Sequence, residues 1–153
     1  SRGYGLGIVV LVGGLPVTVR NLQQGVTSKE ITMLAKATPV LPAEDMERAK
    51  SFYTEKLGLS ILFEMPEGTA FACEDGTAIF VYPHERTLAT HTAASFIVEN
   101  VVAEVARLRE RGVVFEEYDN PGLKTEDGIA QQDDVSAAFF TDTEGNIISI
   151  VQM

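Results

Sequence analysis

The sequence is poor in the residues that form disulfides and metal centres. Its 153 residues include one cysteine, two histidines and no tryptophan. The single cysteine, Cys73, excludes an internal disulfide and a cysteine-rich metal site, so nothing in the chain requires an oxidising compartment. We therefore expect a cytoplasmic protein.

Positive charge is also scarce, since 12 lysines and arginines accompany 22 aspartates and glutamates and the formal net charge is −10. Such a charge repels phosphate backbones and anionic lipid surfaces, which argues against nucleic acid and membranes as partners. The same charge would concentrate cationic ligands near this acidic protein, but an acidic surface that only aids solubility is an open alternative. The chain length is that of one globular domain.

Long hydrophobic runs are absent except near the N-terminus. Residues 3–19 are apolar and uncharged, but the run is shorter than the roughly 20 residues that span a bilayer. It is also interrupted by Gly13, Gly14 and Pro16. Short apolar runs on both sides of Gly13-Gly14 are typical of a β-hairpin with a two-residue turn. We expect a β-rich extension over residues 1–34 that packs on the domain or on a second subunit. An artificial extension is the alternative, because the sequence does not begin with Met.

The rest of the chain, residues 35–153, contains two copies of one pattern. Each copy has a helix that an Asp or Asn caps and a glycine ends, from Asp45 to Gly58 and from Asn100 to Gly112. Between these bounds apolar residues recur at steps of three and four. The expected strands are 38–41, 60–65, 69–73 and 77–82 in the first copy, and 92–98, 113–118, 136–141 and 147–151 in the second. Each copy therefore has the order β-α-β-β-β.

The second copy is longer than the first because of residues 119–134. This stretch is polar, contains glycine and proline, and has no clear periodicity. Long loops of this kind are often lids or binding loops. A surface excursion without function is the equally open alternative.

The two copies resemble the vicinal-oxygen-chelate superfamily of glyoxalases, bleomycin-resistance proteins and extradiol dioxygenases. The resemblance rests on residues 45–53, which read DMERAKSFY and lead to LGL at 57–59, and on the turn DTEGN at 142–146. The family usually has proline where this turn has Thr143. The resemblance implies an α+β fold, in which two βαβββ modules, about 36–84 and 91–153, form curled mixed sheets around a cup with the helices outside. It also implies a homodimer.

Metal-dependent members of the superfamily take one ligand from the first and one from the last strand of each module. Counted from the motifs, these four positions fall on Thr38, Phe80, Ala93 and Ser149. None of them supplies an imidazole or a carboxylate, so we expect neither a metal nor any other cofactor. His91 is the one residual candidate, because it lies two residues before Ala93 and would share its strand face.

Strand alternation assigns side chains to the cup or to the layer beneath the helices. The cup side is expected to hold Ala78, Phe80, Tyr82, Ala93, Ser95, Ile97, Ile147, Ser149 and Val151. The helix side is expected to hold Ile79, Val81, Ala94, Phe96, Val98, Ile148 and Ile150. The residues expected to contact a ligand are Thr38, Phe71, Phe80, Tyr82, Ala93, Ser95, Tyr118 and Ser149. The acidic residues at 116–119 would lie near the mouth of the cup, where they could meet a cation or form a solvated edge.

An apolar, aromatic cup with a few hydroxyls is suited to hydrophobic or planar molecules. By resemblance, the expected function is metal-independent binding of the bleomycin-resistance type, in which an apolar or cationic aromatic compound is sequestered or sensed, as in drug resistance. The first alternative is a glyoxalase-like lyase or isomerase with an altered metal site. No carboxylate or histidine stands on the expected cup side, so general acid-base catalysis is not expected. The second alternative is an interaction module whose cup is filled by its own side chains or by the N-terminal hairpin.

Overall fold

The computed structural model describes residues 9–12, 15–18, 34 and 36–153. The chain divides into two units, Ser1–Ala35 and Lys36–Met153. In the first unit, β1 (Val9–Val12) and β2 (Leu15–Thr18) pair antiparallel. This confirms the expected hairpin, although its turn and residues 1–8 and 19–33 of the expected extension lie outside the described residues. No helix among the described residues is long and apolar enough to cross a bilayer.

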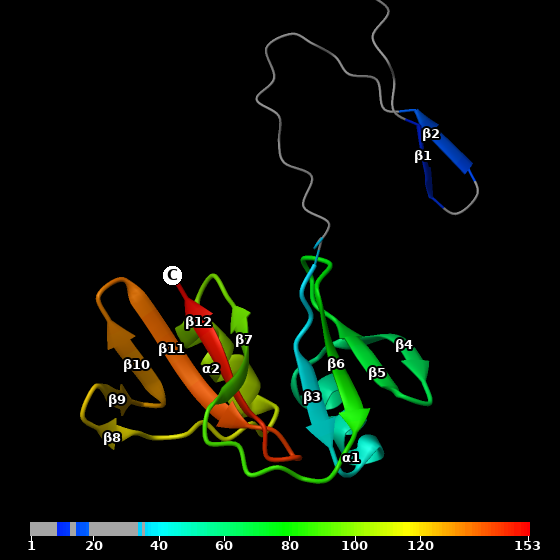
Figure 1. Cartoon of the computed structure of the whole chain (residues 1–153). Helices are drawn as coiled ribbons and strands as arrows, with labels where there is room; N and C mark the ends of the chain where they lie inside the picture. Colours follow the sequence, from blue (N-terminus) through cyan, green and yellow to red (C-terminus); the bar gives the residue numbers. More distant parts are fainter. Residues whose placement is uncertain (1–8, 13–14, 19–33, 35) are drawn as a thin grey trace, which may run out of the picture. The chain divides into compact units, whose positions relative to one another are not determined.

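The first module forms a four-stranded sheet in the order β3-β6-β5-β4 (Figure 1). Its strands are β3 (Val40–Ala43), β4 (Ser60–Met65), β5 (Gly68–Ala72) and β6 (Ala78–Pro83). β3 runs parallel to β6, and the other neighbours are antiparallel. The expected first strand, 38–41, begins two residues later in the structure, so Thr38 precedes β3.

The helix of the first module changes its winding halfway along. Helix α1 (Met46–Ser51) is capped by the Asp45 carboxylate, which accepts a hydrogen bond from the Arg48 backbone N–H at 2.9 Å. A π-helix, η1 (Phe52–Lys56), continues it, with a Leu57 N–H bond to the Phe52 carbonyl. The sequence predicted one regular helix here. The first two residues of the π-helix, Phe52 and Tyr53, are both buried, and their rings meet edge-on with centroids 5.6 Å apart.

The second module forms a six-stranded sheet in the order β7-β12-β11-β10-β9-β8. Its elements are β7 (Thr92–Ile97), α2 (Val101–Glu110), β8 (Asp119–Asn120), β9 (Leu123–Glu126), β10 (Ile129–Gln132), β11 (Val135–Thr141) and β12 (Ile147–Gln152). Figure 1 shows α2 behind β7 and β12. Asn100 caps α2, and Gly112 follows it with a positive φ of 83°, as the capping pattern predicted. Both modules confirm the expected α+β fold.

Two expectations for the second module were wrong. Residues 113–118 do not form a strand, and only Phe115 makes a β-bridge, to Phe140. Residues 119–134 are not a loop but contain β8, β9 and β10, which extend the sheet. Asp127 and Gly128, both with positive φ, make the tight turn between β9 and β10. A tight Asp-Gly turn favours a hairpin through its backbone geometry. The strands on either side therefore form although their residues do not alternate between apolar and polar, which is why they were not expected.

The core lies between the sheets and the helices, as alternation predicted. Ile79 and Val81 of β6 are almost fully buried, and so are Ile148 and Ile150 of β12. They pack with the buried residues of the helices, which are Ala49, Phe52, Tyr53, Val101, Val105 and Leu108. Each sheet has a second face, turned away from its helix, which no described helix covers. We call these two faces the open faces.

Candidate functional site

The open face of the first sheet carries a cavity of about 420 Å³. Thr38 and Phe80 line it, together with Val40 of β3 and Leu62 and Phe63 of β4. Val40 and Leu62 are 56% and 57% exposed, so the cavity presents apolar surface to solvent. The rings of Phe63 and Phe80 lie 6.4 Å apart and form an aromatic wall. The complete lining is Lys36, Ala37, Thr38, Val40, Leu62, Phe63, Ala70, Gly76, Thr77, Ala78 and Phe80.

Gly68 leaves the space in which the Phe80 ring of this wall packs. A β-carbon at Gly68 would lie 2.4 Å from the Val81 carbonyl oxygen and 2.6 Å from the Phe80 ring. Neither distance is compatible with a side chain, so β5 must have glycine at its start for the ring to pack against the strand.

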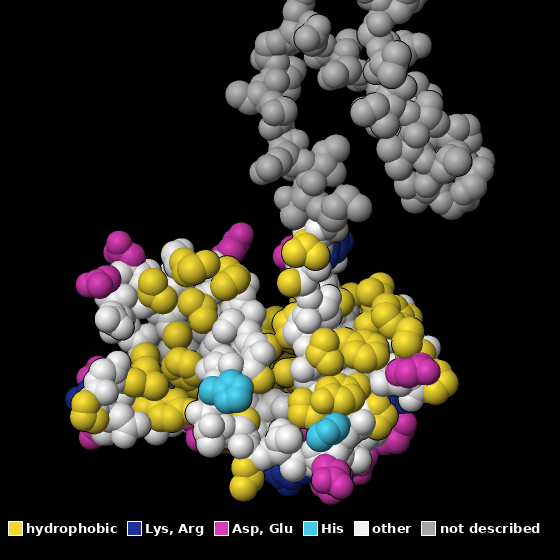
Figure 2. Space-filling view, in the orientation of Figure 1, with side chains coloured by type: hydrophobic (Ala, Val, Ile, Leu, Met, Phe, Trp, Pro, Cys, Tyr) yellow, Lys and Arg dark blue, Asp and Glu magenta, His cyan; other side chains and the backbone are white. Residues whose placement is uncertain are grey.

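The open face of the second sheet is more polar. The hydroxyl oxygens of Ser95 and Ser149 are 2.6 Å apart, and Ser149 is 2% exposed. Phe139 of β11 pairs with Ser149 of β12 and therefore shares its face. The Tyr118 ring meets the Phe139 ring edge-on, with their centroids 5.5 Å apart. Figure 2 shows hydrophobic side chains over both sheets on the side presented there.

A carboxylate also lies on this second face. Glu116 accepts a hydrogen bond from the Thr141 hydroxyl at 3.1 Å, and its backbone N–H donates to the Phe139 carbonyl at 2.8 Å. Thr141 lies two residues after Phe139 and so points to the same side. Burial, and then the negative charge of Glu116, raise the pKa of Tyr118 above its ordinary value. The phenol therefore remains protonated at neutral pH.

The four expected metal positions do not fit a metal ion. Thr38 and Phe80 lie on the first sheet's open face, Ala93 is half-buried in β7, and the Ser149 hydroxyl is already bonded to Ser95. These positions offer a phenyl ring, a methyl group and two neutral hydroxyls. His91 is exposed just before β7. Among the described residues there is no group of three His, Cys, Asp or Glu side chains that could hold a metal.

Of the remaining residues expected to contact a ligand, some lie on an open face and one lies in the core. Ser95, Ser149 and Tyr118 share the second open face, and Tyr82 lies at the end of β6 with its ring 5.5 Å from His84. Phe71 does not lie on an open face. It pairs with buried Ile79 and is 0% exposed, and its ring stacks on Tyr53 at 5.0 Å. The expectation for Phe71 was wrong because the register between β5 and β6 was not considered. Phe71 pairs with Ile79, which faces the helices, so Phe71 faces the helices as well.

Sequence analysis also missed several residues of the open faces. Leu62 and Phe63 were missed because β4 has a bulge between Ile61 and Phe63, which breaks simple alternation. Phe139 could have been found, since alternation along β11 places Ala137, Phe139 and Thr141 on one side. Glu116 was expected only near the mouth of the cup, and its face could not be assigned, because residues 113–118 do not form a regular strand.

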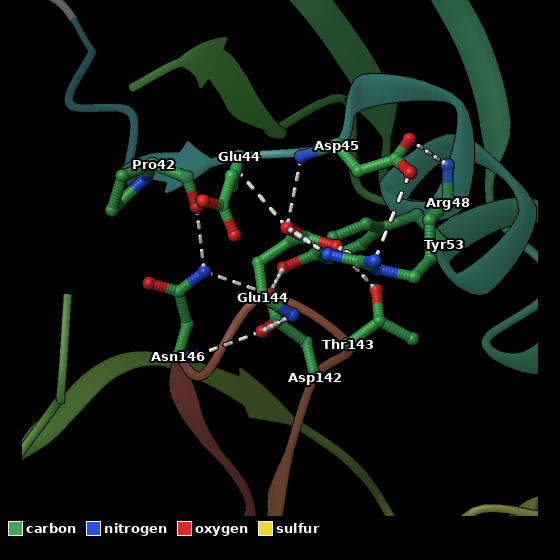
Figure 3. Close-up of polar contacts among 9 residues, drawn as sticks. All are labelled: Pro42, Glu44, Asp45, Arg48, Tyr53, Asp142, Thr143, Glu144 and Asn146. Carbon is green, nitrogen blue, oxygen red and sulfur yellow. Dashed lines mark hydrogen bonds and ion pairs between the residues drawn. The ribbon is translucent and has the colours of Figure 1, made fainter. Parts of the chain in front are cut away.

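A buried polar cluster joins the two modules away from the open faces (Figure 3). Glu144, in the turn between β11 and β12, is 1% exposed and accepts hydrogen bonds from the backbone N–H groups of Glu44 and Asp45 and from the Arg48 guanidinium. Burial alone would raise the pKa of Glu144, but the hydrogen bonds from Arg48, Asp45 and Thr143 outweigh it and lower the pKa. Since its oxygens are occupied and shielded, Glu144 is a structural residue.

Asp142 completes this cluster from the other side of the turn. The Tyr53 hydroxyl donates to the Asp142 carboxylate at 2.7 Å, and the backbone N–H groups of Glu144 and Asn146 donate to its second oxygen. The Asn146 side chain donates to Asp142 and to the Pro42 carbonyl. Burial, and then the charge of Asp142, raise the pKa of Tyr53 well above its ordinary value. The cluster therefore ties the turn between β11 and β12 to β3, α1 and η1.

Comparison with known proteins identifies the family to which the chain belongs. Residues 34–150 match the Glyoxalase/Bleomycin resistance protein/Dioxygenase superfamily, and the chain belongs to this family. It is 32% identical over 126 residues to the uncharacterized protein YurT of Bacillus subtilis (strain 168), an alignment that covers 71% of this chain and 91% of YurT.

Two solved structures illustrate the range of the fold. TnmS3, an antibiotic binding protein from Streptomyces sp. CB03234, matches with a TM-score of 0.56 and 24% identity over 79% of this chain and 98% of its own. Lactoylglutathione lyase from Agrobacterium tumefaciens matches with a TM-score of 0.58 and 16% identity over 77% of this chain and 92% of its own. One is a binding protein and the other an enzyme, so the likeness establishes the fold alone.

Proposed function

We propose that this chain is a metal-independent protein of the bleomycin-resistance type that sequesters or senses a small apolar or cationic aromatic compound. The observation that carries this proposal is the cavity on the first sheet, where two of the four expected metal positions, Thr38 and Phe80, form part of an apolar lining. Cavities of several hundred Å³ with mostly apolar walls suit small organic ligands. The shared fold of the antibiotic binding protein TnmS3 supports the same reading. We further propose a cytoplasmic location and a role in drug resistance.

The protein would act as a homodimer. Exposed apolar residues occur on both open faces, for example Leu62 and Phe63 on the first and Ile97 on the second. A second copy would remove this surface from water and enclose the ligand between the first sheet of one subunit and the second sheet of its partner. A cup of that kind would join Phe80 and Ser149 in one site.

One observation favours an enzyme as the second candidate. Glu116, which was expected only near the mouth of the cup, is a half-buried carboxylate on an open face. A carboxylate beside a bound substrate can remove a proton next to a carbonyl group, as a lyase or isomerase requires. In that case Glu116→Gln would abolish turnover of a substrate while leaving its binding intact.

The test of the binding function is a ligand screen with a matched variant. A panel of neutral and cationic aromatic compounds is screened by thermal shift, and the Kd of each hit is measured for the wild type, for Phe80→Ala and for Val102→Ala. Val102 is 63% exposed on helix α2, away from both open faces, and serves as the control. We expect Phe80→Ala to weaken binding about 10-fold or more, because a buried aromatic contact is lost.

Two outcomes would reject the proposal. One is the absence of any hit in the panel, and the other is equal binding by the wild type and Phe80→Ala. Metal analysis of protein purified without chelator belongs to the same experiment. We expect no stoichiometric Ni, Zn, Mn or Fe, and a bound metal near His91 would favour the enzyme instead.

A further inference from the structure

The polar groups of the second open face lie in a row across the sheet. Ser95 of β7 pairs with Ser149 of β12, and Ser149 pairs with Phe139 of β11. Beyond β11, Tyr118 contacts the Phe139 ring and Glu116 bonds to the Phe139 backbone. Neighbouring strands are about 4.8 Å apart, so the backbones of Ser95 and Glu116, which are three strand spacings apart, are separated by about 14 Å. A small aromatic molecule with a polar substituent at each end spans this length once a hydrogen bond is added at each end.

The serine pair at one end of the row can bind an uncharged oxygen. Each hydroxyl has one proton and two lone pairs, and the 2.6 Å contact uses one of the two protons. Ser149 is 2% exposed, whereas Ser95 is exposed. Ser149 therefore holds the Ser95 hydroxyl in place, and Ser95 offers the remaining proton or a lone pair to a ligand. Neither group carries charge, so the pair suits a hydroxyl or carbonyl oxygen better than an ion.

The other end of the row can bind a cation. The ion pairs between described residues involve Asp45, Glu47, Glu64, Glu104 and Glu144. Glu116 is not among them, and one of its oxygens accepts only the Thr141 hydroxyl. Tyr118 lies two residues after Glu116, and Phe139 lies two residues before Thr141, the partner of the Glu116 carboxylate, so the two touching rings share its side of the sheet. A carboxylate beside aromatic rings attracts an organic ammonium group by charge and by cation-π interaction.

From this arrangement we infer that the second open face selects the ligand's polar groups, and that the ligand is an aromatic amine bearing a hydroxyl or carbonyl oxygen. Glu116, Tyr118 and Phe139 bind the ammonium group, and Ser95 binds the oxygen at the opposite end. Ser149 is a positioning residue that orients Ser95. The inference rests on the proposed binding function and adds the chemical class of the ligand. The acidic charge of the whole chain, −10, attracts the same class.

The test uses probes that differ by one group. Tyramine has an ammonium group and a phenol, phenethylamine lacks the phenol oxygen, and 4-ethylphenol lacks the amine. Kd values are measured by NMR titration of the full chain. We expect tyramine to bind about 10-fold more tightly than 4-ethylphenol, and several-fold more tightly than phenethylamine.

Two variants assign these preferences to residues. Glu116→Gln should abolish the preference for tyramine over 4-ethylphenol, and Ser95→Ala should abolish the preference for tyramine over phenethylamine. Glu110→Gln changes an exposed carboxylate of α2 in the same way and should change neither preference. Tyr118→Leu is a second variant for the cation end, and it should lower tyramine binding while Glu116 is intact.

The outcomes separate this inference from the proposed function. If 4-ethylphenol binds as tightly as tyramine, or if Glu116→Gln keeps the preference for the amine, the inference fails. The proposed binding function is still supported in that case if Phe80→Ala weakens the binding of the neutral compounds of the panel. If neither the probes nor any compound of the panel binds, both proposals are rejected.

Discussion

Arg48 and Glu144 are 96 residues apart in the sequence, yet the guanidinium donates two hydrogen bonds to the carboxylate, at 2.7 and 3.0 Å. Arg48 lies in α1 of the first module, and Glu144 lies in the last turn of the second. The same carboxylate accepts the backbone N–H groups of Glu44 and Asp45, just before α1. One side chain from the second module therefore satisfies unpaired donors at the start of the first module's helix.

The first prediction concerns Glu144→Gln. The amide cannot ion-pair with Arg48 and replaces an acceptor oxygen with a donor, so the buried N–H groups lose part of their hydrogen bonding. We expect a loss of about 2 kcal/mol in the free energy of unfolding, less than for a fully buried pair because Arg48 remains half exposed to water. Urea denaturation measures the change.

Glu47→Gln is the matched control for this prediction. Glu47 also pairs with a basic residue of α1, Lys50, but it is 85% exposed. Exposed ion pairs contribute little, so this variant should lose less than about 1 kcal/mol. Equal losses for the two variants would mean that burial of Glu144 does not strengthen the link between the modules.

The second prediction is the pH dependence of this contribution. The folded-state pKa of Glu144 lies below its ordinary value of 4.5, because hydrogen bonds outweigh burial. An acid whose pKa is lowered on folding stabilises the folded state above the unfolded pKa, and this stabilisation is lost as the pH falls through the folded pKa. The difference in unfolding free energy between wild type and Glu144→Gln should therefore be largest near neutral pH and shrink below 4.5. A constant difference down to about pH 3 would contradict the assigned role.

Much of the fold could be predicted from the residues that begin and end its helices. Asp45 and Asn100 cap the helices, and Gly58 and Gly112 follow them with φ of 81° and 83°, because these features act locally. Local rules failed where a tertiary contact or a backbone turn decides the structure. The π-turn at Phe52 coincides with two buried rings that contact each other, and the strands of 119–134 depend on tight turns.

The candidate site was less predictable for the same reason. Strand alternation placed Phe80, Ser95 and Ser149 correctly with respect to the helices, since one rule fixes the face of every residue in a regular strand. It could not place Glu116, which lies outside any strand. It also could not find the Glu144 cluster, whose partners are about one hundred residues away in the sequence.

The third prediction concerns the proposed dimer. Ile97 is 64% exposed on the open face of β7, and Val102 is 63% exposed on α2, away from that face. If a second copy covers the open faces, Ile97→Asp places a charge in the interface, whereas Val102→Asp places one in the first turn of a helix, where acids are favourable. Light scattering after size exclusion should show twice the chain mass for wild type and Val102→Asp, and a monomer for Ile97→Asp. A monomeric wild type, or an Ile97→Asp dimer of unchanged Kd, would mean that the open faces bind their ligand without a second copy of this chain.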